Sequence, residues 1–590
     1  MLLRRTPFLI FLTASLLGSA SLQPAFSQSL QKENSLSMGA ITGRVLNENG
    51  QPISQATVFV SGPMGVPQQR STTTNDDGNF LVSGLDPALY FVRAVAPAYV
   101  TAPRDPDSPS PSSYRIGDSV NINLIKGGVI TGKVTSSNGQ PLVQAAVRAT
   151  LIRDPNGKPP SGPRFQFEKT TDDRGIYRIY GLAAGTYVVS AGGRVSTFNL
   201  SAYDADSPTY APSATRALAA EIEVRAGEET TGVDIRHRGE PGHSISGTVS
   251  GSTSQTSPTN ITLAQAVNGV SQLSGFSYQL PNSSGFAFYG VADGDYDLIA
   301  QSASAEGDQQ LSEPLRITVK GKDFSGANLT LNTLPAVSGR VVLETSTTPE
   351  CKNKRKPLFS ETSLMALRSS KQGKEPLVFP NFSGALQTSP GKTGDFVLRN
   401  LVPGQFSLNV RFFAKYWYLR RIERNPSVAQ AARIANADRQ NDLARNGFQL
   451  KFGERLNNVT VMLAEGAGSL RGAVKLAGDE SVPAKLYVHL VPAEKENTED
   501  VLRFFTTLVQ TDGKFSLINV PPGRYWVVAR LSANGEPQFD AKLRAPDEAD
   551  TRLQIRREAE ANKTELELKP CQNVVDYNYR LELSRKKLVR

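Results

Sequence analysis

Short runs of alternating apolar and polar residues follow one another along the chain, and their order repeats five times. Such alternation predicts β-strands with one buried face. Each copy opens with a β-branched stretch that ends in Gly-x-Val, at Gly43, Gly132, Gly247, Gly339 and Gly472. A turn glycine follows 35 to 55 residues later, at Gly78, Gly175, Gly285, Gly394 and Gly513. An aromatic residue lies eleven or twelve residues beyond it, at Tyr90, Tyr187, Tyr296, Phe406 and Tyr525.

The second copy shows most clearly how one unit is built. Residues 129–134 are rich in β-branched side chains, and residues 145–149 alternate between core-type and other positions. The turn signal at residues 138–141 separates these two strands. Residues 172–175 predict a hairpin, because Asp suits the first turn positions and Gly supplies a positive φ. Residues 187–191 predict the following strand.

A closing strand ends each unit, at residues 120–124, 222–224 with 233–235, 315–319 with 327–331, 448–450 with 459–463, and 553–555 with 566–568. About seven short strands in roughly 90 to 130 residues predict an antiparallel β-sandwich. A unit of this length can bury its own core. The expected fold is therefore all-β, with five tandem antiparallel β-sandwiches of prealbumin-like or Ig-like type in a semi-rigid rod.

The same signals set the expected boundaries of the repeats. These are residues 39–126, 127–240, 241–332, 333–464 and 465–569, preceded by a linker at 28–38 and followed by a basic tail at 570–590. The third repeat diverges from the pattern. The fourth carries an alanine-rich insert of helical character at about residues 427–445.

The repeated pattern resembles the carboxypeptidase regulatory-like domain, a family with a transthyretin-like (prealbumin-like), carbohydrate-binding-like fold. The first copy carries the resemblance at Gly43, Asn49-Gly50-Gln51-Pro52, Ala56, Val58, Asp77-Gly78, Phe80, Leu85 and Tyr90. Residues 132–187 carry it more completely, and the later copies keep the glycine–aromatic half. The resemblance implies the fold of nearly the whole mature chain. It implies no single function, because such modules accompany peptidases, transporters, adhesins and sugar-binding proteins.

The N-terminus indicates export. Arg4 and Arg5 precede an apolar run at residues 8–17, and Ala25 and Ser27 form a small-x-small cleavage site, so residues 1–27 are read as a signal peptide. No later apolar stretch is long enough for a membrane helix. The formal charge is +10, but basic residues are scattered and the chain is exported, which argues against a nucleic-acid partner. The expected location is the periplasm, the extracellular space or the outer cell surface.

The sequence offers little catalytic chemistry. His237 and Glu240 match the His-x-x-Glu of a zinc peptidase, with His243 nearby, but they lie between two repeats and no room remains for a catalytic domain. Asp293, Asp295 and Asp297 alternate along an expected strand, where either a calcium site or an exposed acidic face would fit. We expect no enzyme, no cofactor and no resident metal.

Two sets of residues in the fourth repeat are candidates for more specific roles. Cys351 and Cys571 are the only cysteines, and in an exported chain they form either one disulfide or two separate thiols. Departures from the repeat pattern are candidate binding sites. They comprise the basic loop at residues 352–356, the insert, and the ligand-binding candidates Tyr416, Trp417, Tyr418, Arg420 and Arg421. The competing interpretation is that Trp417 packs the insert onto the sandwich.

These observations predict a non-catalytic, exported binding or spacer protein of the bacterial surface or periplasm. The alternative is an accessory carbohydrate-binding protein that assists polysaccharide capture or uptake. A polysaccharide or a cell-surface protein would be the partner, and the sequence gives no oligomeric state.

Overall fold

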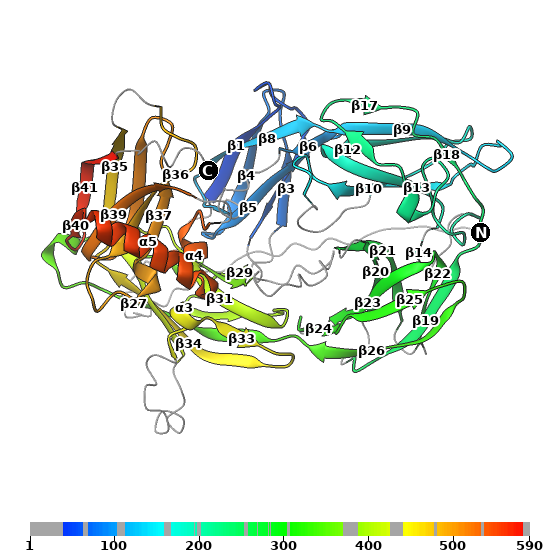
Figure 1. Cartoon of the computed structure of the whole chain (residues 1–590). Helices are drawn as coiled ribbons and strands as arrows, with labels where there is room; N and C mark the ends of the chain where they lie inside the picture. The colour runs from blue at the N-terminus through cyan, green and yellow to red at the C-terminus, as the bar shows by residue number, and fades with distance from the viewer. Residues whose placement is uncertain are drawn as a thin grey trace, which may run out of the picture. The chain divides into compact units, whose positions relative to one another are not determined.

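The computed structural model describes residues 39–62, 69–102, 113–158, 167–193, 195–196, 202–252, 258–267, 270–280, 283, 285–303, 307–369, 387–424, 441–476, 481–532 and 536–581 (Figure 1). Strands predominate in these ranges and pack as β-sandwiches, which confirms the all-β prediction. We use "module" for the segment of each expected repeat. Their number and limits stay a prediction, because residues Met38–Arg590 form one compact unit.

The first module contains β1 (Gly39–Leu46), β2 (Thr57–Ser61), β3 (Gln69–Thr73), β4 (Asn79–Leu85), β5 (Tyr90–Val95), β6 (Tyr99–Thr101), β7 (Ser113–Tyr114) and β8 (Ser119–Lys126). They form two sheets with the orders β4-β1-β8-β6 and β3-β2-β5-β7. Alternate residues of both sheets, Ile41 and Val58 among them, meet in one hydrophobic core.

The second module contains β9 (Gly128–Thr135), β10 (Ala146–Arg153), β11 (Phe167–Thr170), β12 (Ile176–Leu182), β13 (Gly185–Ala191), β14 (Val195–Ser196), β15 (Thr209–Tyr210), the 3-10 helix η1 (Arg216–Leu218), β16 (Ile222–Val224), β17 (Glu229–Thr230) and β18 (Ile235–Arg236). One sheet has the order β11-β10-β13-β15, with β16 also on β13, and the other has β12-β9-β17, with β18 also on β9.

The third module contains β19 (His243–Ser250), β20 (Thr259–Val267), β21 (Val270–Gln279), β22 (Phe286–Val291), β23 (Gly294–Ala303), β24 (Gln309–Ser312), β25 (Leu315–Val319) and β26 (Phe324–Thr333). Its two layers are continuous, because β24 pairs with both β23 and β26. β14 of the second module extends this sheet by pairing in parallel with β21.

The fourth module contains β27 (Ala336–Glu344), η2 (Pro349–Cys351), η3 (Phe359–Glu361), β28 (Ser363–Arg368), β29 (Gln387–Thr388), β30 (Asp395–Leu398), β31 (Gly404–Arg411), β32 (Trp417–Arg424), α3 (Leu443–Asn446), β33 (Phe448–Leu450) and β34 (Arg455–Glu465). The two sheets have the orders β30-β27-β34-β32 and β29-β28-β31-β33.

The fifth module contains β35 (Gly468–Leu476), β36 (Leu486–Pro492), η4 (Val501–Arg503), β37 (Phe505–Leu508), β38 (Lys514–Val520), β39 (Gly523–Leu531), α4 (Asp540–Leu543), η5 (Pro546–Glu548), α5 (Ala549–Asn562), β40 (Glu565–Leu568) and β41 (Asn573–Leu581). The sheets have the orders β38-β35-β41 and β37-β36-β39-β40. Ile555 and Ala559 of α5 pack on the outer face of the β36–β39 sheet.

Two expectations for the fifth module differ from the structure. Residues 553–555, expected as part of a closing strand, lie inside α5, because the segment is rich in Ala, Arg, Glu and Gln, which favour helix. Residues 573–581, expected in a basic tail, form β41 and pair with β35. The alternation of polar residues with Tyr577, Tyr579 and Leu581 is a strand pattern that the basic residues after it obscured.

The Gly-x-Val glycines have a common structural cause. In every module the opening strand pairs antiparallel with a hairpin strand and, on its other side, in parallel with the closing strand. The parallel pair refines the expectation of purely antiparallel sheets. A side chain on the glycine would overlap a carbonyl oxygen of the closing strand, at Val120, Val233, Ala327, Val459 and Tyr577 respectively. Only glycine permits this approach.

The late aromatic residue also has a common role. In four modules a buried tyrosine donates its hydroxyl hydrogen bond to the backbone carbonyl four residues earlier, at 2.8–2.9 Å, in the pairs Tyr90–Asp86, Tyr187–Ala183, Tyr296–Ala292 and Tyr525–Pro521. The fourth module has Phe406 instead, whose ring stacks on Phe448. The tyrosine thus fixes the turn that precedes its own strand.

The third and fourth modules share a polar joint. The Asn400 side chain accepts a hydrogen bond from Gln309 N and donates one to Gly307 O, at 2.9 and 3.1 Å. Asp308 forms ion pairs with Arg399 and Arg455, at 3.1 and 3.0 Å. These contacts tie the β23–β24 connection of one module to two parts of the next.

Candidate functional site

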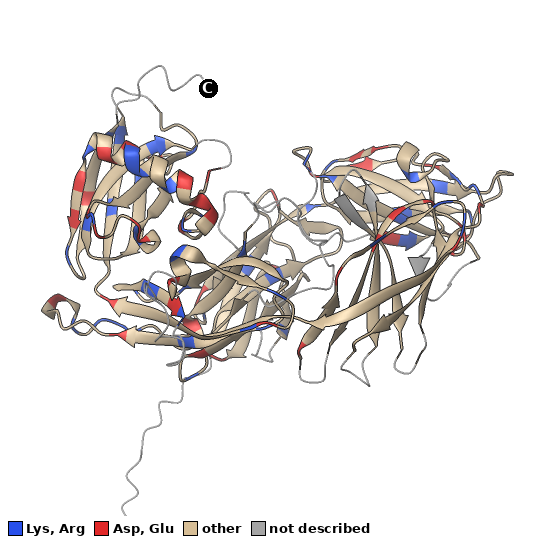
Figure 2. Ribbon diagram, turned by 60° about the horizontal axis from the view of Figure 1, so that its bottom comes forward, with Lys and Arg blue, Asp and Glu red and all other residues tan. Residues whose placement is uncertain are grey.

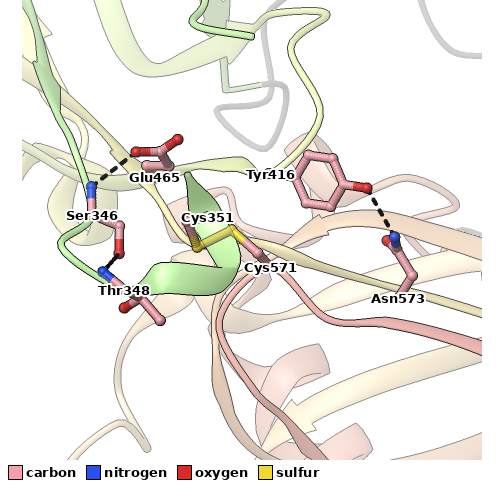
Figure 3. Close-up of a disulfide and its surroundings, with 7 residues drawn as sticks. All are labelled: Ser346, Thr348, Cys351, Tyr416, Glu465, Cys571 and Asn573. Atoms are coloured by element: carbon pink, nitrogen blue, oxygen red, sulfur yellow. Dashed lines mark hydrogen bonds between the residues drawn. A yellow bond between two sulfur atoms is a disulfide. The ribbon is translucent and has the colours of Figure 1, made fainter. Parts of the chain in front are cut away.

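A disulfide joins the fourth and fifth modules beside the start of β41 (Figure 3). Cys351 ends η2, and Cys571 lies two residues before β41. Their Cα atoms are 5.5 Å apart, and the two residues are only 1% and 8% exposed. The Cys571 N–H donates to the carbonyl of Gly466 at 2.9 Å, which fixes the chain next to the disulfide. The two cysteines, which the sequence left open as a pair or as separate thiols, meet at this junction.

Tyr416 lies close to the disulfide and contacts both modules (Figure 3). Its hydroxyl oxygen accepts a hydrogen bond from Asn573 Nδ2 at 2.9 Å, and its carbonyl accepts from the N–H groups of Gly466 and Ala467. The Lys354 ammonium lies 4.6 Å from the centre of its ring. The Tyr416 side chain therefore contacts groups of the junction itself.

Trp417 does not reach a ligand-accessible surface. It is 0% exposed and belongs to the core cluster of the fourth module, because it starts β32 with its side chain on the inner face of the sheet. This position corrects its assignment as a ligand-binding candidate and favours the packing interpretation. Tyr418, on the other face, is half-buried, and burial raises the pKa of its hydroxyl.

Arg420 and Arg421 are exposed but already paired. A β-bulge between Leu419 and Arg421 interrupts the pairing of β32 with β34. Arg420 forms an ion pair with Glu344, and Arg421 lies 3.5 Å from Glu423. Such solvated ion pairs contribute little free energy. An anionic ligand could therefore replace the carboxylate partner of either arginine at little cost in free energy. The structure separates these two guanidinium groups from the buried Trp417 ring.

The other departures from the repeat pattern lie near the same junction. In the basic loop, Arg355 pairs with Glu361 at 2.8 Å. The insert expected at residues 427–445 lies outside the described residues up to 440. Its last part forms the short helix α3, whose N-terminal amides bond to the Asp442 carboxylate.

A cavity of about 510 Å³ lies between β28 and β31 of the fourth module and the α4–η5 segment of the fifth. Its lining residues are Leu367, Arg368, Ser369, Gln405, Phe406, Ser407, Phe539, Ala541, Lys542, Ala545, Pro546, Asp547 and Glu548. The Ser369 hydroxyl donates to Asp547 Oδ2 at 2.8 Å across the cavity wall, and burial lowers the pKa of Arg368. A pocket of this size, with both apolar and polar side chains in its lining, suits a small ligand.

No sequence pattern predicts this cavity. Its walls come from segments about 130 to 180 residues apart in the sequence. Only the packing of α4 and η5 against β31 brings these side chains together.

The three histidines have different neighbours. His237 is buried with its Nε2 3.8 Å from Asp206 Oδ2, and burial lowers the pKa of its imidazole. His243 Nε2 lies 3.2 Å from Asp293 Oδ1. His489 is buried in β36 of another module. Among the described residues, no three His, Cys, Asp or Glu side chains are arranged to hold a metal ion.

The acidic triplet is likewise bound to neighbouring groups. Asp293 accepts a hydrogen bond from Gly321 N, and Asp295 accepts one from the Thr318 hydroxyl. Asp297 is only 4% exposed and receives a bidentate ion pair from Arg316. Each carboxylate thus has a protein partner in place of a shared cation.

Charges of both signs alternate over the described ribbon, including along α5 (Figure 2). No helix in the described ranges has the length and apolar character needed to cross a bilayer.

Comparison with known proteins identifies part of the chain. Residues 40–113 match the carboxypeptidase regulatory-like domain, which confirms the resemblance for the first module. The chain matches none of the curated proteins.

Solved structures with some similarity include the Bacillus anthracis TIE protein, at 13% identity and a TM-score of 0.14, over 50% of this chain and 51% of that one. They also include GBS52, the minor pilin of Streptococcus agalactiae, at 15% and 0.19, over 34% and 96%. BcpA, the major pilin subunit of Bacillus cereus, matches at 10% and 0.14, over 50% and 99%. The chain thus spans about half the length of the first of these proteins. TM-scores this low do not support an inference about function.

Proposed function

We propose that this chain is an exported, non-catalytic spacer or binding protein of the cell surface or periplasm, built from carboxypeptidase regulatory-like β-sandwiches. The proposal rests on the ion pairs, hydrogen bonds and disulfide that hold consecutive modules together. A spacer transmits position only if consecutive modules cannot swing freely, and modules joined by flexible linkers swing by default.

Two joints have this property. At the joint of the third and fourth modules, Asp308 pairs with two arginines and Asn400 bonds to the backbone on both sides of it. At the joint of the fourth and fifth modules, the disulfide adds a covalent tie. Val501 and Leu502 of η4 also complete the hydrophobic core of the fourth module. The apolar side chains of one module thus serve the core of its neighbour.

The first experiment tests export and joint stiffness together. Expression in a bacterial host followed by N-terminal sequencing is expected to find a mature chain that begins at Gln28, outside the cytoplasm. Small-angle scattering of that chain is then compared with Asp308→Ala and with Cys351→Ser, which each remove the ion pairs or the covalent bond of one joint. Asp395→Ala is the matched control, because it removes an exposed ion pair with Arg340 inside one module.

We expect the two joint variants to broaden the distribution of intramolecular distances and the control to leave it unchanged. A wild-type chain that already scatters as freely linked beads would refute the spacer role. Release of product from peptide or glycan substrates would refute the non-catalytic assignment.

Accessory carbohydrate binding is the second candidate function, and the cavity between β31 and α4 favours it. Phe539 offers a half-buried aromatic face, and Gln405 and Asp547 offer hydrogen-bonding groups around it. Sugars bind to such combinations of an apolar face and directed polar groups. A glycan array of the mature chain tests this function, with Phe539→Ala as the site variant and Tyr289→Ala, an exposed aromatic of another module, as the control. Binding that survives Phe539→Ala would place any sugar site elsewhere.

A further inference from the structure

The closing strand of the fifth module has an open edge. β41 is the outermost strand of the sheet β38-β35-β41 (Figure 1), and within the described ranges no strand pairs with its other side. In three other modules an antiparallel strand pairs with this side of the closing strand, at residues 124–126 of β8, 331–333 of β26 and 459–465 of β34. In the second module the closing strand is broken into two pieces of two residues, β17 and β18, and very short edge strands resist pairing.

The fifth module has lost its covering strand for a visible reason. The segment between β39 and β40, which would supply it, folds into α4, η5 and α5. α5 packs on β36 and β39 of the other sheet, and so does not shield β41. Among the described residues, the nine-residue strand β41 is therefore left with one unpaired side.

The backbone groups on that side can be assigned from the first module. There the carbonyl of Asn123 in β8 accepts a hydrogen bond from Ala102 N, on the edge away from β1. Val120 of β8 faces Gly43, as Tyr577 of β41 faces Gly472. Asn123 lies three residues after Val120, and Arg580 lies three residues after Tyr577. Arg580 is therefore the equivalent of Asn123.

Alternate residues of a strand direct their N–H and C=O groups to the same side. Beyond the β-bulge at residues 575 and 576, the free edge of β41 therefore presents the backbone of Asn578 and Arg580. The Asp576 carbonyl is bonded at 2.9 Å by the side-chain amide of Asn578.

We propose that β41 pairs antiparallel with β41 of a second copy of this chain, with Asn578 opposite Asn578. In this register the outward-facing Asn578 residues of the two strands meet, so that their backbone groups can exchange a pair of hydrogen bonds. A pairing of identical edges about one point is self-complementary and closes as a two-fold dimer.

The side chains favour the same register. Asp576 comes opposite Arg580 of the second copy, once on each side of the centre, and opposite charges across a strand pair are stabilising. Both side chains are exposed. Tyr577 comes opposite Tyr579, and aromatic pairs across strands are also favourable. Val574, Tyr577 and Leu581 are only partly buried at the margin of the core, where a further strand would cover them.

The extent of the edge limits the affinity. A β-bulge lies between Val574 and Tyr577, and Asp576 has a φ of 58° there, so the regular ladder is short. We therefore expect a reversible dimer with a dissociation constant on the order of micromolar to tens of micromolar.

Sedimentation velocity of the mature full chain over a concentration series tests the pairing. The wild type is expected to shift from monomer to dimer as its concentration rises to about 100 µM. Asn578→Pro removes an outward-facing N–H at an edge position that tolerates proline, and is expected to abolish the dimer without lowering the melting temperature. A wild type that stays monomeric over the whole series would overturn the proposal.

A charge exchange tests the register without relying on proline. Asp576→Arg and Arg580→Asp each place like charges opposite one another, so each variant alone is expected to dimerise at least about tenfold more weakly than the wild type. Mixed in equal amounts, the two variants have opposite charges at both positions and are expected to recover dimerisation. Unchanged dimerisation of the single variants, or a mixture that associates no better than they do, would overturn it.

Discussion

Gly339 of β27 lies so close to the carbonyl oxygen of Val459 in the parallel strand β34 that a Cβ at this position would overlap that oxygen. The same relationship holds between the opening and closing strands of every module. The glycine is therefore required by the parallel pair, and not by a turn.

Gly339→Ala tests this requirement. The methyl group would have to separate β27 from β34 in the middle of the sheet, and such overpacking costs about 1 to 3 kcal/mol or more. Gly391→Ala is the control, because in the same module its Cβ would lie 3.6 Å from the nearest atom, Asp395 O. Thermal denaturation followed by circular dichroism is expected to show a lower melting temperature for Gly339→Ala only. Equal melting temperatures would mean that the strands separate at no cost.

The repeated glycines and aromatics were sufficient to predict the sandwich, because each reports a local contact that recurs in every module. Gly132 marks the parallel pair, and Tyr187 marks the turn that its hydroxyl bonds. The sequence could not give the partner of each contact, since Val233 lies about a hundred residues from Gly132.

The candidate site was less predictable for a physical reason. Trp417 and Arg420 are neighbours in sequence, but alternation along β32 buries one and exposes the other. The cavity beside α4 depends on two modules packing together, and no periodicity within either module reports that contact.

The disulfide gives a second prediction. Cys351 and Cys571 are 220 residues apart, and in the chain-entropy model a loop of this length contributes roughly 5 kcal/mol to the free energy of unfolding. Cys351→Ser is expected to lower the melting temperature of the fourth and fifth modules and to leave the first module unchanged. Intact mass after alkylation, with and without reductant, checks the bond directly. Two alkylated thiols in non-reduced protein from an oxidising compartment would contradict it.

His489 gives a prediction about acid. It is 3% exposed, neither ring nitrogen has a hydrogen-bond partner among the described residues, and burial with the nearby Arg530 lowers the pKa of its imidazole to about 3. The unfolded chain, with an ordinary histidine pKa of about 6.5, binds the proton more readily. Above pH 6.5, His489 therefore does not change the free energy of unfolding. As the pH falls from 6.5 towards about 3, it lowers the free energy of unfolding.

The expected slope is about 1.4 kcal/mol per pH unit within that window. His489→Phe removes the titrating group from an apolar site, so its free energy of unfolding is expected to depend less on pH between about 6 and 4. Urea denaturation at a series of pH values measures both slopes. Parallel curves for the two proteins would show that His489 is solvated or paired in the folded state.

Trp417 and Arg420 give the last prediction, which separates packing from binding. Trp417 fills the core of the fourth module together with Leu463 and Ile422, and truncation of a buried large side chain costs about 3 to 5 kcal/mol. Trp417→Ala is therefore expected to lower the melting temperature of this module strongly. Arg420→Ala removes only a solvated ion pair with Glu344, so its effect is expected to stay within about 1 kcal/mol.

Differential scanning calorimetry of both variants distinguishes the two roles. If the aromatic–arginine segment were a ligand site, Trp417→Ala would leave the melting temperature unchanged and reduce binding of the ligand found for the wild type. If Trp417 packs the core, loss of binding would accompany unfolding, and Arg420→Ala would retain both stability and ligand. A stable Trp417→Ala protein would therefore contradict the burial of this ring, whatever its effect on binding.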